Sequence, residues 1–130
     1  MKTVLFICVH NSGRSQMAEA YFNRMAKGKA RAFSAGSHPD DKVNPSVVKV
    51  MLEEGFDLSG NIPRMLTPEM MAGTDRAITM GCENSCPFTT VPTVDWGLED
   101  PKNKTIEQIR IIRDQIKTRV SALIDEFVTG

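Results

Sequence analysis

The sequence predicts a single α/β domain over residues 1–130, built on a small parallel sheet. The chain is 41% hydrophobic and 25% charged, which fits one ordinary globular domain of 130 residues. Short apolar runs alternate with amphipathic helical segments, the order typical of strands that pair in parallel. The sequence contains no internal repeat and no low-complexity tract that would indicate another architecture.

The strands and helices follow from local patterns. Residues 3–8 are apolar without polar alternation, which predicts a central strand buried on both faces. Helical spacing of apolar residues predicts a long C-terminal helix, opened by a capping box at Thr105 and Gln108. The other expected elements are a helix over 14–27, a strand over 30–35, a helix from the N-cap Asn44 to about Glu54, a short helix from Thr67, and strands over 76–80 and 94–96.

Charge and cysteine content narrow the function classes. Sixteen Lys and Arg balance sixteen Asp and Glu, so there is no basic field to attract nucleic acid or an anionic membrane. No apolar run approaches the roughly 20 residues that span a bilayer, and residues 4–9 are too few for a signal peptide. We therefore expect a cytoplasmic monomer with three reduced thiols.

A cysteine and an arginine flank the loop between the first strand and the first helix. Backbone amides of such a loop converge on one point, and the helix N-terminus favours a bound anion there. Arg14 can clamp an oxyanion with two hydrogen bonds, and the same donors favour a nucleophilic thiolate at Cys8. The predicted oxyanion-binding residues are Val9, His10, Asn11, Ser12, Gly13, Arg14 and Ser15.

The alternative interpretation is a buried cysteine that precedes an ordinary helix with an exposed arginine. Asn11 and Gly13 argue against it, because both residue types accept the left-handed backbone angles that a tight anion loop requires. His10 remains open between tuning Cys8 and pointing outward.

Three motifs carry a family resemblance. Cys8-x5-Arg14-Ser15, Ser34-Ala-Gly36 and Glu99-Asp100-Pro101 resemble the low-molecular-weight protein tyrosine phosphatase fold. That resemblance implies a four-stranded parallel sheet flanked by helices, with Cys8 as nucleophile, Arg14 as oxyanion clamp and Asp100 as general acid. Because of two further cysteines, the chain is more similar to the thioredoxin-coupled arsenate reductases of this fold.

The two further cysteines suggest a redox reaction. Reducing arsenate takes two electrons, which two thiols supply when they form a disulfide. In the implied relay Cys8 attacks arsenate, Cys82 attacks Cys8 and expels arsenite, and Cys86 then attacks Cys82. Thioredoxin, an external dithiol, would open the final disulfide, so no bound cofactor is expected. Gly81 is a candidate hinge before Cys82.

Three other interpretations of Cys82 and Cys86 stay open. A zinc site would need more nearby ligands than this pair offers, so no metal is predicted. The pair could also be simply buried. The main alternative function is a low-molecular-weight protein tyrosine phosphatase in which the pair protects the nucleophile from overoxidation.

The residue after Asp100-Pro101 bears on the substrate. Tyrosine phosphatases that share this resemblance typically carry an aromatic residue there, whereas this chain has Lys102. The lysine favours a small inorganic anion such as arsenate, with phosphate and sulfate as competitors.

Some members of the resembled family hold a potassium ion, at positions that map to Asn11, Glu19 and Ser34. Arg64 falls where a further acidic ligand would stand, so we predict no potassium site and interpret Glu19 as a solvated helix residue.

Overall fold

The computed structural model describes residues 2–81 and 92–129. Four strands form one parallel sheet in the order β2-β1-β3-β4. They are β1 (Lys2–Cys8), β2 (Ala30–Gly36), β3 (Arg76–Thr79) and β4 (Thr93–Asp95). The predicted α/β class and four-stranded parallel sheet are confirmed, although the fourth strand lies one residue earlier than the expected 94–96.

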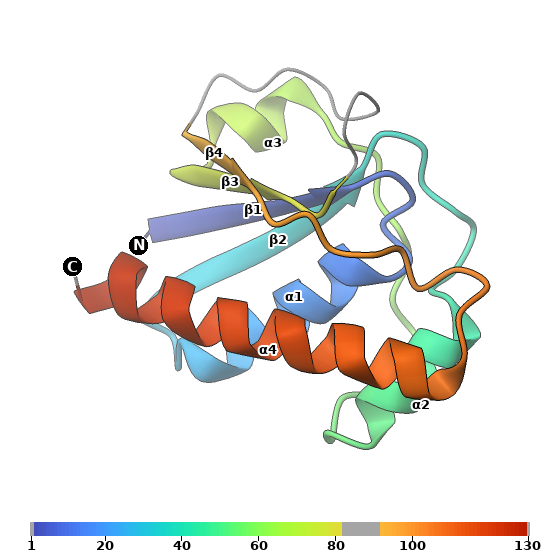
Figure 1. Cartoon of the computed structure of the whole chain (residues 1–130). Helices are drawn as coiled ribbons and strands as arrows, with labels where there is room; N and C mark the ends of the chain where they lie inside the picture. Colours follow the sequence, from blue (N-terminus) through green and yellow to red (C-terminus); the bar gives the residue numbers. More distant parts are fainter. Residues whose placement is uncertain (1, 82–91, 130) are drawn as a thin grey trace.

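Helices cover the two faces of the sheet unequally. Figure 1 shows α1 (Arg14–Met25), α2 (Pro45–Leu52) and α4 (Ile106–Thr129) on one side and the short α3 (Pro68–Ala72) on the other. The larger core lies on the three-helix side, where the predicted face of α4 is buried. The apolar residues that α4 buries there are Ile109, Ile112, Ile116, Val120, Leu123 and Phe127.

The predicted helix caps are confirmed. The side chain of Asn44 accepts a hydrogen bond from the amide of Ser46 at 2.9 Å, which satisfies a free donor at the start of α2. Thr105 and Gln108 exchange backbone-to-side-chain hydrogen bonds of 2.9 and 3.2 Å before α4. These local contacts explain why both helices begin where the sequence indicates.

The strand β1 determines where the functional loop lies. It pairs with β2 on one side and β3 on the other; of the predicted buried residues 3–8, residues 4–8 are buried and Thr3 is partly exposed. Cys8 lies opposite Gly36 in the β1–β2 register. Because all four strands are parallel, the loops that follow Cys8, Gly36 and Thr79 leave the sheet at one edge.

Among the helices of the described residues, none is long and apolar enough to cross a membrane.

Candidate active site

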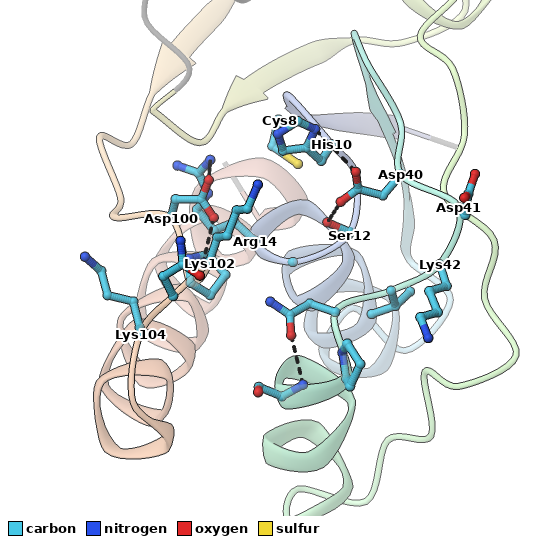
Figure 2. A pocket seen from close by; sticks show the side chains of 17 residues that line it. Cys8, His10, Ser12, Arg14, Asp40, Asp41, Lys42, Asp100, Lys102 and Lys104 are labelled. Atoms are coloured by element: carbon cyan, nitrogen blue, oxygen red, sulfur yellow. Dashed lines mark hydrogen bonds and ion pairs between the residues drawn. The ribbon is translucent and has the colours of Figure 1, made fainter.

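Residues 8–14 form a loop at the floor of a cavity of about 600 Å³. The loop runs from the end of β1 into α1, and no side chain caps the first turn of that helix. Cys8, Arg14 and Asp100 all line the cavity, although Asp100 is 86 positions away from Arg14 in the sequence (Figure 2). The structure thus brings together the three residues that the resemblance singled out.

The sulfur of Cys8 is surrounded by hydrogen-bond donors. It lies 3.2 Å from the backbone amide of Asn11 and 2.7 Å from the hydroxyl of Ser15. The side-chain amide of Asn11 donates to that hydroxyl at 2.8 Å, which leaves the hydroxyl hydrogen free to point at the sulfur. Both groups are placed to donate to a Cys8 thiolate, the form in which a thiol is a nucleophile.

The residues of the loop divide between the cavity and the interior. His10, Ser12, Gly13 and Arg14 line the cavity, whereas Asn11 and Ser15 are fully buried behind it. Asn11 has a φ of 50°, the left-handed conformation expected of it.

The expectation for Gly13 was wrong. Its φ is −145°, which lies outside the left-handed region. A Cβ atom at this position would lie 2.8 Å from Cγ of Pro101. Glycine is needed here because the loop carrying Asp100 packs directly against the anion loop.

The guanidinium of Arg14 is held from two sides. Its Nη1 donates to the carbonyl oxygens of Met80 and Leu98, each at 2.7 Å. Its Nη2 lies 3.9 Å from the carboxylate of Asp100, which is half exposed. The backbone amide of Lys102 donates to the other oxygen of that carboxylate at 2.9 Å. Asp100 is therefore oriented beside Arg14 at the rim of the cavity.

A second wall of the cavity was not predicted. Residues 37–46 run beside the anion loop, and the amides of His38, Asp40 and Asn44 donate to its carbonyl oxygens at 2.8, 3.0 and 2.8 Å. Asp40, Asp41 and Lys42 from this segment line the cavity. The pairing of β1 with β2 was a usable signal, because loops that follow neighbouring parallel strands must lie side by side.

His10 and Ser12 contact this second wall. Ser12 donates to the carboxylate of Asp40 at 2.8 Å, and Nδ1 of His10 lies 3.6 Å from the same group (Figure 2). Nδ1 is also 3.0 Å from the carbonyl oxygen of His38. His10 therefore lies at the cavity mouth, fixed to the wall and partly exposed.

The interpretation of Glu19 as a solvated helix residue was wrong. Its carboxylate accepts hydrogen bonds from Ser34 at 2.6 Å and from the guanidinium of Arg64 at 2.8 Å. The backbone amide of Arg64 also donates to Asn11 at 2.8 Å. A protein cation thus lies at the position that maps to the potassium site of the resembled family.

Cys82 and Cys86 lie outside the described residues. Gly81, directly before them, has a φ of 106°, a conformation that favours glycine. Within residues 2–81 and 92–129, no group of three His, Cys, Asp or Glu side chains could hold a metal ion.

Comparison with known proteins agrees with the site geometry. The family model described as low molecular weight phosphotyrosine protein phosphatase matches residues 3–129. A putative arsenate reductase of Halobacterium salinarum is 42% identical over 128 residues, which cover 94% of this chain and 90% of that protein.

Solved structures give the same grouping. An arsenate reductase in the phosphate binding state superposes with a TM-score of 0.84 at 34% identity, covering 97% of this chain and 98% of that one. A thioredoxin-dependent arsenate reductase of Corynebacterium glutamicum has a TM-score of 0.82 at 35% identity; the match covers 97% of this chain but only 61% of that one. The chain belongs to the low molecular weight phosphotyrosine protein phosphatase family.

Proposed function

We propose that this protein is an arsenate reductase that converts arsenate to arsenite. The observation that carries the proposal is Cys8, which lies at the floor of an anion loop with donors on its sulfur and Arg14 beside it. Support comes from relatives of nearly the same length that are named arsenate reductases.

The first step is attack by the Cys8 thiolate on the arsenic of arsenate. An S–As bond forms and one As–O bond breaks, while Arg14 and the loop amides hold the remaining oxygens. Asp100 gives its proton to the departing oxygen, which leaves as water. The position of Asp100 beside Arg14, half exposed and within the same cavity, supports this role.

The reduction itself is a thiol–disulfide relay. The Cys82 thiolate attacks the Cys8 sulfur; an S–S bond forms, the S–As bond breaks, and its electron pair stays on arsenic, which leaves as arsenite. Cys86 then attacks Cys82, which releases the Cys8 thiolate and leaves a Cys82–Cys86 disulfide. Two thiols are oxidised for each arsenate reduced.

The cavity lining supports a small inorganic substrate. None of its 17 described lining residues is Phe, Tyr or Trp, and Lys42, Lys102 and Lys104 lie among them. Among the described lining residues an aryl phosphate would find no Phe, Tyr or Trp ring to stack on, whereas a tetrahedral oxyanion needs only amides and cations. Phosphate and sulfate should compete for the loop because they have the same shape and charge.

The proposed external reductant is thioredoxin. A thioredoxin-dependent relative supports it, and the Cys82–Cys86 disulfide needs a dithiol partner. In a coupled assay with thioredoxin, thioredoxin reductase and NADPH, arsenate should drive NADPH oxidation. Cys8→Ser should abolish that rate, and phosphate should slow it by competition. If only glutaredoxin with glutathione sustains turnover, the thioredoxin assignment is wrong.

The alternative, a phosphatase with a redox-protective cysteine pair, is favoured by the family match alone. It predicts hydrolysis of a phosphate ester through Cys8 and no consumption of NADPH with arsenate. The same preparation can be tested both ways.

A further inference from the structure

We infer that Asp95 is a positioning residue for the oxyanion clamp, acting on Arg14 through one peptide group. Asp95 is the last residue of β4 and does not line the cavity. The inference concerns anion binding and holds whichever oxyanion is the substrate.

The carboxylate of Asp95 holds the end of β3. One oxygen, Oδ1, accepts hydrogen bonds from the hydroxyl of Thr79 at 2.6 Å and from the backbone amide of Gly81 at 2.8 Å. These two donors flank Met80 on either side. A single carboxylate oxygen therefore fixes the chain where it leaves the sheet.

The peptide group between Met80 and Gly81 is the link to the clamp. Its N–H end donates to Asp95, and its C=O end accepts Nη1 of Arg14 at 2.7 Å. Because a peptide group is planar, fixing the N–H direction fixes the carbonyl direction too. The negative charge at the N–H end also polarises the group and strengthens the carbonyl as an acceptor.

The backbone of Leu98 forms the other side of the arginine's surroundings. The carbonyl of Met80 also accepts the amide of Leu98 at 3.1 Å, and the carbonyl of Leu98 is the second acceptor of Nη1. Gly81 has a φ of 106°, and a Cβ there would lie 2.8 Å from the Leu98 carbonyl oxygen and 3.3 Å from Nη1. The arginine is thus seated in a close-packed backbone cradle, and Asp95 anchors one side of it.

The test measures the binding of inorganic phosphate. Bound phosphate protects Cys8 from alkylation by iodoacetamide, and mass spectrometry of the peptide that contains Cys8 measures how much has been alkylated. Asp95→Ala should raise the phosphate dissociation constant about tenfold, since it removes a charge-assisted hydrogen bond from the cradle. Asp95→Asn keeps an acceptor oxygen without the charge, so its increase should be about threefold. Arsenate reduction is not needed for this readout, so the proposed function can fail while this inference stands.

Thr79→Val is the matched control. It removes the other hydrogen bond to Oδ1 and leaves the Gly81 contact intact, so it should lower the thermal midpoint as Asp95→Ala does while phosphate affinity stays within about twofold.

In an Arg14→Lys background, Asp95→Ala should change affinity by less than about twofold, because the guanidinium that it positions is gone. The inference is overturned if Asp95→Ala binds phosphate as the unmodified protein does, if Thr79→Val weakens binding equally, or if the Asp95 and Arg14 effects add.

Discussion

Ser15 shows how a buried hydroxyl can act on the nucleophile. Its oxygen receives a hydrogen bond from Asn11 at 2.8 Å and lies 2.7 Å from the sulfur of Cys8, which leaves its hydrogen free to point at the sulfur. Ser15→Ala should slow alkylation of Cys8 by iodoacetamide about tenfold at neutral pH, because the thiolate loses one donor. The variant Ser59→Ala, at an exposed turn, controls for loss of a hydroxyl. An unchanged Ser15→Ala rate would mean that the hydroxyl does not support the thiolate.

Lys102 tests the substrate preference at the level of one side chain. Replacing it by Phe adds a phenyl ring to a lining whose described members include no Phe, Tyr or Trp. Lys102→Phe should raise kcat/KM for para-nitrophenyl phosphate by about three- to tenfold, the value of one aromatic contact. Lys102→Met separates this gain from loss of the positive charge. Equal gains in both variants would show that charge rather than stacking limits aryl substrates.

Residue patterns predicted the part of the site that is contiguous in sequence. Cys8 and Arg14 flank one loop, so a local motif was enough. Asp100 needed the family resemblance, because nothing local distinguishes it from other acidic residues. Asp40 and Asp95 were missed because the fold rather than the local sequence places them: Asp40 lies beside the anion loop through the pairing of β1 with β2, and Asp95 contacts the end of β3. Gly13 was misinterpreted because its close neighbour is Pro101 and its φ is not left-handed.

At the scale of elements, helices with caps were easier to predict than the edge strand β4. A side-chain cap such as Asn44 depends on a few residues that are adjacent in the sequence, so a local pattern predicts it. β4 has three exposed residues and, among the described strands, pairs with β3 alone, so its sequence carries little burial pattern to mark its ends. β1, with two neighbours and both faces covered, carried the clearest signal.

An ion cluster joins α2 to α4. Hydrogen bonds from Arg110, and next from Arg113, lower the pKa of Glu53 from its ordinary 4.5 to about 2. A carboxyl group with a lowered pKa contributes stability above its unfolded pKa and loses it as the pH falls through the folded value. This contribution should therefore be complete above about pH 4.5 and fade toward pH 2.

Glu53→Gln tests that contact. The difference in thermal midpoint between the unmodified protein and this variant should be constant above pH 5 and shrink as the pH falls toward 2, by the linkage argument. Glu126→Gln, at the exposed ion pair with Arg76, controls for removal of a carboxylate. A midpoint difference for Glu53→Gln that does not change with pH would contradict the assignment.

At the scale of the whole molecule, we propose that residues 1–130 form one domain. The described strands make one sheet, and one large core joins it to α1, α2 and α4. Calorimetry should show a single transition with equal calorimetric and van't Hoff enthalpies, and phosphate should raise its midpoint by binding the folded state. Two separate transitions would mean that the chain divides into independent units.

Charge at this scale explains why the anion site is local. Sixteen basic and sixteen acidic residues leave a net charge of zero, so the molecule as a whole does not attract oxyanions. Affinity must come from the loop amides, Arg14 and the lysines at the cavity mouth.

The central claim is that Cys8 passes electrons from thiols to arsenate, and a single-turnover thiol count tests it most directly. Fully reduced protein is mixed with arsenate, or with phosphate as control, and free thiols, arsenite and intact mass are measured. The account predicts two thiols lost and one arsenite released per chain with arsenate, none with phosphate, and a trapped Cys8–Cys82 disulfide in Cys86→Ser. Survival of all three thiols, with hydrolysis of a phosphate ester through Cys8, would contradict the relay and identify a phosphatase.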